Sequence, residues 1–333
     1  MGKPSIRDVA NVSGVSTATV SHVINGDKAV SKNTRDKVVQ AIDLLGYKPN
    51  LVARSFKTGK RNLIAFIVPD IANPFFSTLI EEIESILSKE NYNLIVANTK
   101  ETKDRELASI KTLGSGFVDG FIIASTLEDY KEIDAVLQKD VPTIFIDRKL
   151  PNCPFETLCI DSFEATFESI NYLINKGHTK IGYITGLNRI STTQERLRAY
   201  KEAMTKAGLD CKQFVRIGNS MSHCVISHLT SLIDSGCSAI VIANNLMATE
   251  ALTKLLDDGM LAKNQIELVG FKDSDQPQYG LQHMSIINQP TSQLGKLAGL
   301  RILEMLNSEN VFLSRRPITA LKATFEPKGT PTR

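Results

Sequence analysis

The sequence predicts an α/β protein with a small helical unit at its N-terminus and a larger body of two doubly wound parallel sheets. Apolar residues recur at helical spacing over residues 6–25, with a glycine break in the middle. From Asn62 onwards, short apolar runs alternate with segments of helix length. Short apolar strands that alternate with helices are typical of parallel sheets covered on both faces.

Residues 6–25 predict two short helices joined by a tight turn. Ile6, Val9 and Ala10 form the apolar stripe of the first helix, and Gly14 can end it in a left-handed conformation. Ser16 stands where the second helix needs a side chain that accepts from its first N–H groups. The outer face of the second helix has no charged side chain and consists of Thr17, Ala18, Ser21, His22 and Asn25. Such a face suits a helix lying in the major groove of DNA, although an ordinary helical hairpin has the same spacing.

A third helix is predicted from about residue 31 to residue 45, capped by Ser31 or Asn33 and followed by Gly46. Its core-facing residues are expected to be Val38, Val39, Ile42 and Leu45. Lys32, Arg35 and Lys37 are candidates for phosphate contacts, and a solvated basic face explains them equally well.

After Pro49, residues 51–57 could form one to two turns of helix, too short to be stable without a partner or DNA. The charge of this region differs from that of the rest of the chain. Residues 1–60 contain 10 Lys and Arg against 4 Asp and Glu, a net charge of +6, which leaves 29 against 32, or −3, for the remainder. The positive charge therefore lies on the segment with the helix pair, as phosphate binding requires.

The body divides into two successive halves of alternating strands and helices. Strands are expected at residues 63–68, 93–98, 119–124, 142–147 and 156–160 in the first half, and at 180–185, 213–218, 239–244 and 266–271 in the second. The helix over 291–307 should return to the first half, and the last strand, about 318–325, should join the second. The resulting domains are 1–60, with a hinge helix at about 50–58, and 61–333, with an N-subdomain of about 61–160 and 290–318 and a C-subdomain of about 161–289 and 319–333.

Ligands of such sheets bind at the carboxyl ends of the strands, which here means the cleft between the two halves. Polar and aromatic residues that follow strands, or lie in the last crossover, are the candidates. We predict an effector site made of Asn73, Phe76, Asp147, Arg148, Arg196, Asn244, Lys272 and Gln289. Amides, arginines and carboxylates suit a polyhydroxyl ligand, with Phe76 as a platform for a ring, although each residue could also be a loop or capping residue.

Several motifs, in this order along the chain, resemble those of the lactose-repressor/galactose-repressor (LacI/GalR) family of bacterial repressors. They are IRDVA, SGVS and TVSHVIN in the helix pair, then YKPN (47–50), ARSFKTGK (53–60), VPDIANPFF (68–76), QERLRAY (194–200) and INQP (287–290). TVSHVIN is most similar to the form found in ribose and purine repressors. The resemblance implies a helix-turn-helix head and a hinge helix joined to a body like periplasmic binding proteins.

The resemblance also implies how DNA is bound. Thr17, Ala18 and His22 would read bases in the major groove, while paired hinge helices would fold on the operator and enter the minor groove. Phe56 matches the position of the hinge wedge, where the family usually has Leu, so an aromatic wedge would replace the usual one. The full set of predicted DNA-binding residues is Ser5, Ser16, Thr17, Ala18, Ser21, His22, Asn25, Ser31, Thr34, Asn50, Ala53, Arg54, Phe56 and Lys57.

Lys272 departs most clearly from the family pattern for the effector site. Arg196, Asn244 and the position of Lys272 match core effector positions, and similar repressors usually have Asp where this chain has Lys272. A lysine has only donors, so together with Arg196 it would favour an anionic ligand such as a sugar acid or sugar phosphate. Alternatively, Lys272 pairs with Asp273 or Asp275 and points away from the cleft.

The sequence does not favour catalysis, a cofactor or a metal site. It contains no phosphate-binding glycine loop, no GxSxG and no HExxH, and its five cysteines are scattered without metal-ligand spacing. No apolar run reaches the length of a membrane span, and we expect a cytoplasmic protein. A periplasmic solute-binding protein would share the body, but it would need a signal peptide and would lack the basic helix pair.

The predicted function is that of a transcriptional repressor of carbohydrate-use genes. It would bind a near-palindromic operator as a homodimer, because one helix pair reads too few base pairs, and a sugar-like effector would control it. Without a heptad tail after the last strand, we expect dimers rather than tetramers. The alternative within the family is a global catabolite regulator whose co-repressor is a phosphorylated carrier protein.

Overall fold

The computed structural model describes residues 4–26, 28–48, 60–218, 224–261, 263, 265–273, 280–308 and 318–329. The chain divides into two compact units, a head of Met1–Arg61 and a body of Asn62–Arg333. The predicted α/β class, with N-terminal helices and two largely parallel sheets, is confirmed. No described helix is both long and apolar enough to cross a membrane.

The head contains three helices, α1 (Ile6–Ser13), α2 (Thr17–Asn25) and α3 (Lys32–Leu45). Each begins at a serine, Ser5, Ser16 or Ser31, whose hydroxyl accepts from a backbone N–H of the first turn. Each is followed by a glycine with a positive φ, where a side chain would be strained. The helices enclose one small core, whose buried members are Val9, Ala10, Val20, Val23, Val38 and Ala41.

The prediction for α3 was wrong at Val39, which is 45% exposed. Val38 and Ala41 are buried, and Ile42 and Leu45 pack against them. Successive helical residues are separated by about 100°, so Val39 is turned away from the stripe formed by these four residues.

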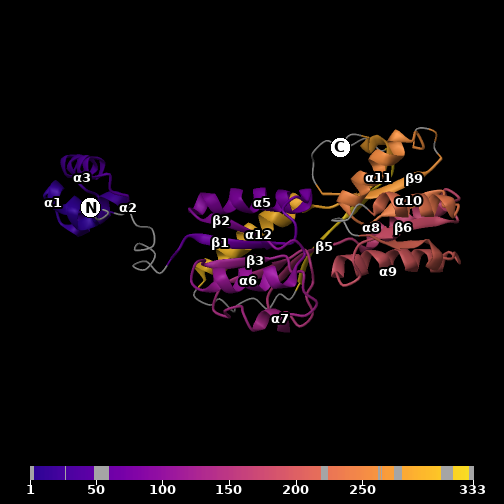
Figure 1. Ribbon diagram of the computed structural model, residues 1–333, viewed down its shortest axis with the longest axis horizontal. Coiled ribbons are helices and arrows are strands. Elements are labelled where there is room, and N and C mark those ends of the chain that lie inside the picture. The colour runs from indigo at the N-terminus through magenta and orange to yellow at the C-terminus, as the bar shows by residue number, and fades with distance from the viewer. Residues whose placement is uncertain are drawn as a thin grey trace. The chain divides into compact units, whose positions relative to one another are not determined.

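The N-subdomain is a six-stranded parallel sheet in the order β11-β5-β4-β3-β1-β2. Its strands are β1 (Leu63–Val68), β2 (Asn93–Asn98), β3 (Gly120–Ile123), β4 (Thr143–Ile146), β5 (Thr157–Asp161) and β11 (Ile318–Lys322). Helices α5 (Pro74–Leu87) and α12 (Thr291–Asn307) cover one face, while α6 (Lys103–Gly114) and α7 (Lys131–Asp134) cover the other (Figure 1).

The C-subdomain contains the second sheet, in the order β12-β10-β9-β8-β6-β7. Its strands are β6 (Ile181–Thr185), β7 (Val215–Ile217), β8 (Ala239–Ile242), β9 (Glu267–Lys272), β10 (Ser285–Asn288) and β12 (Thr324–Glu326), of which only β12 runs antiparallel to its neighbour. Helices α8 (Phe163–Asn175) and α9 (Ser191–Lys206) pack on one face, and α10 (Val225–Asp234) and α11 (Asn245–Asp257) on the other.

The last strand corrects the predicted subdomain boundary. Residues 318–325 were expected to form one strand of the second sheet, but β11 pairs with β5 in the first sheet and only β12 joins the second. The two strands are separated at Ala323, which is buried and whose N–H donates to Asp161 O at 2.9 Å. β11 thereby covers the backbone edge of β5, which would otherwise be left unpaired.

α12 packs closely against α5, and two glycines permit the approach. A Cβ on Gly295 would lie 2.8 Å from Glu82 Cβ and 3.3 Å from Leu79 O, and one on Gly299 would lie 2.8 Å from Ile86 Cβ. Both helices begin beside the cavity between the subdomains, because α5 starts directly after Asn73 and α12 starts two residues after Gln289. The tight contact therefore joins two elements that start at the candidate effector site.

Candidate functional site

A cavity lies between the two subdomains at the carboxyl ends of their strands. Seven of the eight predicted effector residues line it, namely Asn73, Phe76, Asp147, Arg148, Arg196, Asn244 and Gln289. They follow strands of both sheets or come from α5 and α9. The strands therefore converge on one site, as expected for parallel sheets that face each other.

Arg196 of α9 makes a hydrogen bond through each nitrogen of its guanidinium group. Only 8% exposed, it donates from Nε to Ser162 Oγ at 3.2 Å, from Nη1 to Ala243 O at 2.8 Å and from Nη2 to Gln289 Oε1 at 2.7 Å. Its guanidinium also lies over the Phe271 ring, 3.9 Å from the centroid. These contacts hold a positive, planar group at the floor of the cavity.

Asp273 takes the place in the cavity that was expected for Lys272. Residues alternate in direction along a strand, so Phe271 and Asp273 face the cavity side, and Lys272 is not among the lining residues. Asp273 accepts a hydrogen bond from Gln289 Nε2, and its second carboxyl oxygen has no partner among the described residues. Burial raises the pKa of Asp273 to about 7.

Asp147 reaches the cavity through an unusual backbone conformation. Its φ is 69°, and the N–H of Arg148 donates to Ile146 O at 2.8 Å, which closes a three-residue turn directly after β4. Burial raises the pKa of the Asp147 carboxyl above its usual range. A non-glycine residue in this region costs on the order of 1 kcal/mol, and such strain is frequent at binding sites.

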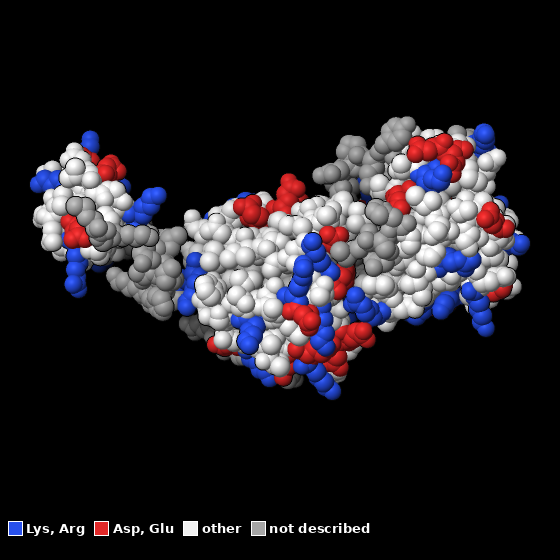
Figure 2. Space-filling view, viewed as in Figure 1, with Lys and Arg blue, Asp and Glu red and all other residues white. Residues whose placement is uncertain are grey.

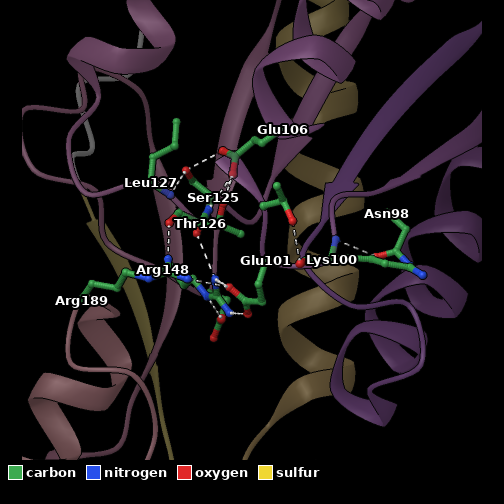
Figure 3. A network of polar contacts seen from close by, with 11 residues as sticks. Asn98, Lys100, Glu101, Glu106, Ser125, Thr126, Leu127, Arg148 and Arg189 are labelled. Carbon is green, nitrogen blue, oxygen red and sulfur yellow. Dashed lines mark hydrogen bonds and ion pairs between the residues drawn. The ribbon is translucent and has the colours of Figure 1, made fainter. Parts of the chain in front are cut away.

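Arg148 is held by a residue that the sequence reasoning missed. Its guanidinium donates to both carboxylate oxygens of Glu101, which also lines the cavity (Figure 3). Glu101 follows β2 in a turn with positive φ, and nothing in the local pattern signals that turn. Asp273 follows the strand expected over 266–271 and so was a candidate like Lys272, but only Lys272 entered the predicted set, although a strand period of two could have placed Asp273 in the cavity.

Two asparagines place helix N-termini at the cavity. Asn73 Oδ1 accepts from Phe75 N at 3.0 Å at the start of α5, and Asn244 Oδ1 accepts from Met247 N at 3.1 Å at the start of α11. Asn245 Nδ2 also donates to Asn73 Oδ1 at 2.7 Å, a direct contact between the subdomains. Helix N-termini and amides add donors for oxygen-rich ligands.

In the head, the predicted base readers lie at the start and middle of α2. Thr17 and Ala18 are exposed, and Ser21 and His22 are half-buried. The hydroxyls of Ser5, Ser16 and Ser31 act as helix caps, and Thr34 contacts Ser31. The side chain of Asn25, together with Asn50, Ala53, Arg54, Phe56 and Lys57 of the predicted hinge, lies outside the described residues.

On the face drawn in Figure 2, Lys and Arg side chains project from the head in several directions beside acidic side chains, and both charge signs are also interspersed on the body. Exposed basic residues of the head include Arg7, Lys28, Lys32, Arg35, Lys37 and Lys48. This charge is available for DNA phosphates. Among the described residues, no group of three or more His, Cys, Asp or Glu side chains could hold a metal ion.

Known proteins resemble the chain over nearly its whole length. Residues 61–322 match periplasmic binding proteins and the sugar-binding domain of the LacI family, and residues 5–50 match bacterial regulatory proteins of the lacI family. Catabolite control protein A of Streptococcus mutans is 32% identical, with 92% of each chain covered. The HTH-type transcriptional repressor PurR of Vibrio campbellii is 30% identical, again with 92% of each covered. The Lac repressor dimer bound to operator and the anti-inducer ONPF has the same fold, with a TM-score of 0.82 and 22% identity over 98% of both chains.

Proposed function

This chain belongs to the LacI family of bacterial regulatory proteins, and on that premise we propose how it senses a ligand and binds its operator. It is a DNA-binding transcriptional regulator and not an enzyme. Our proposal is a homodimeric repressor that works on chromosomal DNA in the cytoplasm. Two heads read a near-palindromic operator, and a small, uncharged, sugar-like effector occupies the cavity of the body.

The observation that carries the effector proposal is the composition of the cavity. Polar side chains from both subdomains surround Phe76, which can support the apolar face of a sugar ring. The lining has four carboxyl groups, on Asp70, Glu101, Asp147 and Asp273, against two guanidinium groups, on Arg148 and Arg196. An excess of acceptors suits hydroxyl donors. This excess argues against the anionic effector that a Lys272 side chain in the cleft would favour.

The control mechanism follows from the division of the site. Asn73 and Asp147 belong to the N-subdomain, and Arg196 and Asn244 to the C-subdomain, so a ligand that contacts all four stabilises one arrangement of the two. A change in that arrangement would alter the spacing of the paired hinges and hence the affinity for the operator.

The effector proposal is tested by thermal shifts of the purified protein against neutral sugars, sugar acids, sugar phosphates and purines. Stabilisation by a neutral sugar is expected. Arg196→Lys keeps the charge but loses the fork and the stacking on Phe271, so it should bind the same sugar at least about tenfold more weakly. Stabilisation by acids or phosphates alone would contradict the proposal, and a purine response would redirect it to the purine-repressor branch.

The DNA-binding proposal is tested with operators selected from random DNA. A near-palindrome with two half-sites should emerge, because a two-fold dimer presents two identical heads. Sedimentation of the protein should give dimers. Tetramers at low concentration, or a selected site without two-fold symmetry, would contradict this assembly.

A further inference from the structure

Glu101 is presented to the effector cavity by a strained turn. Lys100 and Glu101 have φ values of 51° and 55°, in the left-handed region that non-glycine residues rarely adopt. The turn is held by hydrogen bonds from Lys100 N to Asn98 Oδ1 at 3.4 Å and from Glu101 N to Pro69 O at 3.1 Å. Thr102 Oγ1 also donates to Lys100 O at 3.0 Å. The surrounding contacts therefore determine where the Glu101 carboxylate lies.

Arginines from both subdomains approach the Glu101 carboxylate (Figure 3). Arg148 of the N-subdomain donates from Nη2 to Oε1 at 2.6 Å and from Nη1 to Oε2 at 3.0 Å. Arg189, in the C-subdomain loop after β6, places Nη2 3.9 Å from Oε2. The side chains of Glu101 and Arg148 are only 17% and 11% exposed, so solvent weakens their interaction little.

The backbone carbonyl that accepts a hydrogen bond from Arg189 is itself held in place by a second set of hydrogen bonds. Arg189 Nη1 donates to Thr126 O at 2.7 Å. The loop that carries this carbonyl is held by Glu106 of α6, whose fully buried carboxylate accepts from Ser125 Oγ at 2.6 Å and from Thr126 N at 2.7 Å. Thr126 Oγ1 is a third donor, at 2.6 Å. Arg148, Arg189 and Glu101 are therefore each held from outside the cluster.

We propose that Glu101 is a specificity-determining residue, a carboxylate of the chain itself that occupies a two-arginine anion site and so selects an uncharged effector. The inference rests on the proposed effector site. The paired N–H groups of the Arg148 fork, which would bind a ligand carboxylate or phosphate, are already taken by Glu101. Among the residues that the structure describes, Arg148 Nε has no hydrogen-bond partner, and it lies 3.5 Å from Asp147 Oδ2, so an anion approaching it meets a second carboxylate.

Removal of the carboxylate should open an anion site between the two guanidinium groups. Without Glu101, Arg148 and Arg189 lose the counter-ion that they share, and the like charges then destabilise the contact between the subdomains. A small carboxylate from solution can take the vacant place, because it presents the same two oxygens. A ligand that carries a carboxylate or phosphate would gain the same pair of partners.

The first test is rescue of Glu101→Ala by sodium formate, measured as a melting temperature against sodium chloride at equal ionic strength. The variant should melt at a lower temperature than the wild type, and formate should raise its melting temperature more than chloride does. The wild type and Asp104→Ala, which removes an exposed acid on α6, should not distinguish the salts. Glu101→Gln fills the vacancy with an amide and should not be rescued. An Ala variant that responds equally to both salts, or a Gln variant rescued like it, would overturn the proposal.

The second test compares binding of glucose with glucuronate and of galactose with galacturonate. Glu101→Ala should shift the preference toward the acid by about tenfold or more relative to wild type, the order expected for one charge-assisted pair, and Glu101→Gln, whose amide still fills the place, should shift it less. An unchanged preference in both variants would overturn the inference. If neither pair binds any variant, the effector class is wrong, but the formate measurement, which needs no sugar and no DNA, still reports on Glu101.

Discussion

At the scale of single residues, Asp273 should make the stability of the body depend on pH. Burial raises the pKa of Asp273 from 3.8 to about 7, so the folded protein keeps this proton at pH values where the unfolded chain has lost it. The stability that Asp273 contributes is therefore complete below about pH 4 and is lost as the pH rises through about 7.

We therefore expect the free energy of unfolding of Asp273→Asn to rise relative to that of the wild type as the pH rises. Between about pH 5 and pH 8 the relative gain in unfolding free energy should be on the order of 3 kcal/mol, measured by urea unfolding. Asp70→Asn removes a carboxyl from the same cavity at a more exposed position and serves as the control. An equal pH trend for the two variants would argue against a raised pKa at Asp273.

His22 is the residue of α2 whose loss should change base preference most. It can donate to or accept from base edges, whereas Thr17 and Ala18 offer smaller groups. His22→Ala should lower affinity for a selected operator by about 1–3 kcal/mol and leave affinity for scrambled DNA nearly unchanged. Lys37→Ala, at an exposed basic position of α3, serves as the control and should weaken binding to the operator and to scrambled DNA to a similar degree. If His22→Ala also weakens both equally, the histidine contacts only the backbone.

At the scale of elements, the contact between α5 and α12 should tolerate no added side-chain atom. Gly295→Ala would place a Cβ 3.3 Å from the Leu79 carbonyl oxygen and 2.8 Å from Glu82 Cβ, so the helices would have to separate. The steric cost of about 1–3 kcal/mol should exceed the helix-propensity gain of about 1 kcal/mol. Denaturant unfolding should show a net loss of stability, while Gln293→Ala, on the exposed side of α12, should stay within about 0.5 kcal/mol of wild type. A stabilised Gly295→Ala would show that the helices can move apart freely.

Pairing between elements also explains why the last strand was predicted in the wrong sheet. The pattern of residues 318–325 reads as one strand, but β11 and β12 pair with partners more than 30 residues away in the sequence, in different sheets. Which sheet an edge strand joins depends on where unpaired backbone is left, and local apolar spacing does not report that.

At the scale of the whole molecule, operator affinity should fall steeply with salt. Residues 1–60 carry a net charge of +6 and the remainder −3, so the favourable electrostatics are confined to the heads. If two heads together neutralise about 6–10 phosphates, affinity should fall by about 10³–10⁵ between about 50 and 200 mM salt. Fluorescence anisotropy with labelled operator measures the slope. A flat salt dependence would contradict phosphate binding by the heads.

The sequence by itself determined the class of the protein, the three capped helices of the head and the two successive halves of the body. These features depend on apolar spacing and capping residues within a few positions of each other, which the chain displays directly. It also indicated seven residues that line one cavity. The carboxyl ends of parallel strands lie at the same edge of a sheet whatever the course of the connecting loops.

Only the tertiary structure decided which charges enter that cavity. The direction of β9 turned Asp273 toward Arg196 and left Lys272 out of the lining, which decides between the two orientations that the sequence allowed for Lys272. A turn with two positive φ values presented Glu101 to Arg148, across 47 residues of sequence. Both outcomes depend on backbone direction and on contacts between residues distant in the chain. A shift of the strand by one residue would place Lys272 in the cavity instead of Asp273.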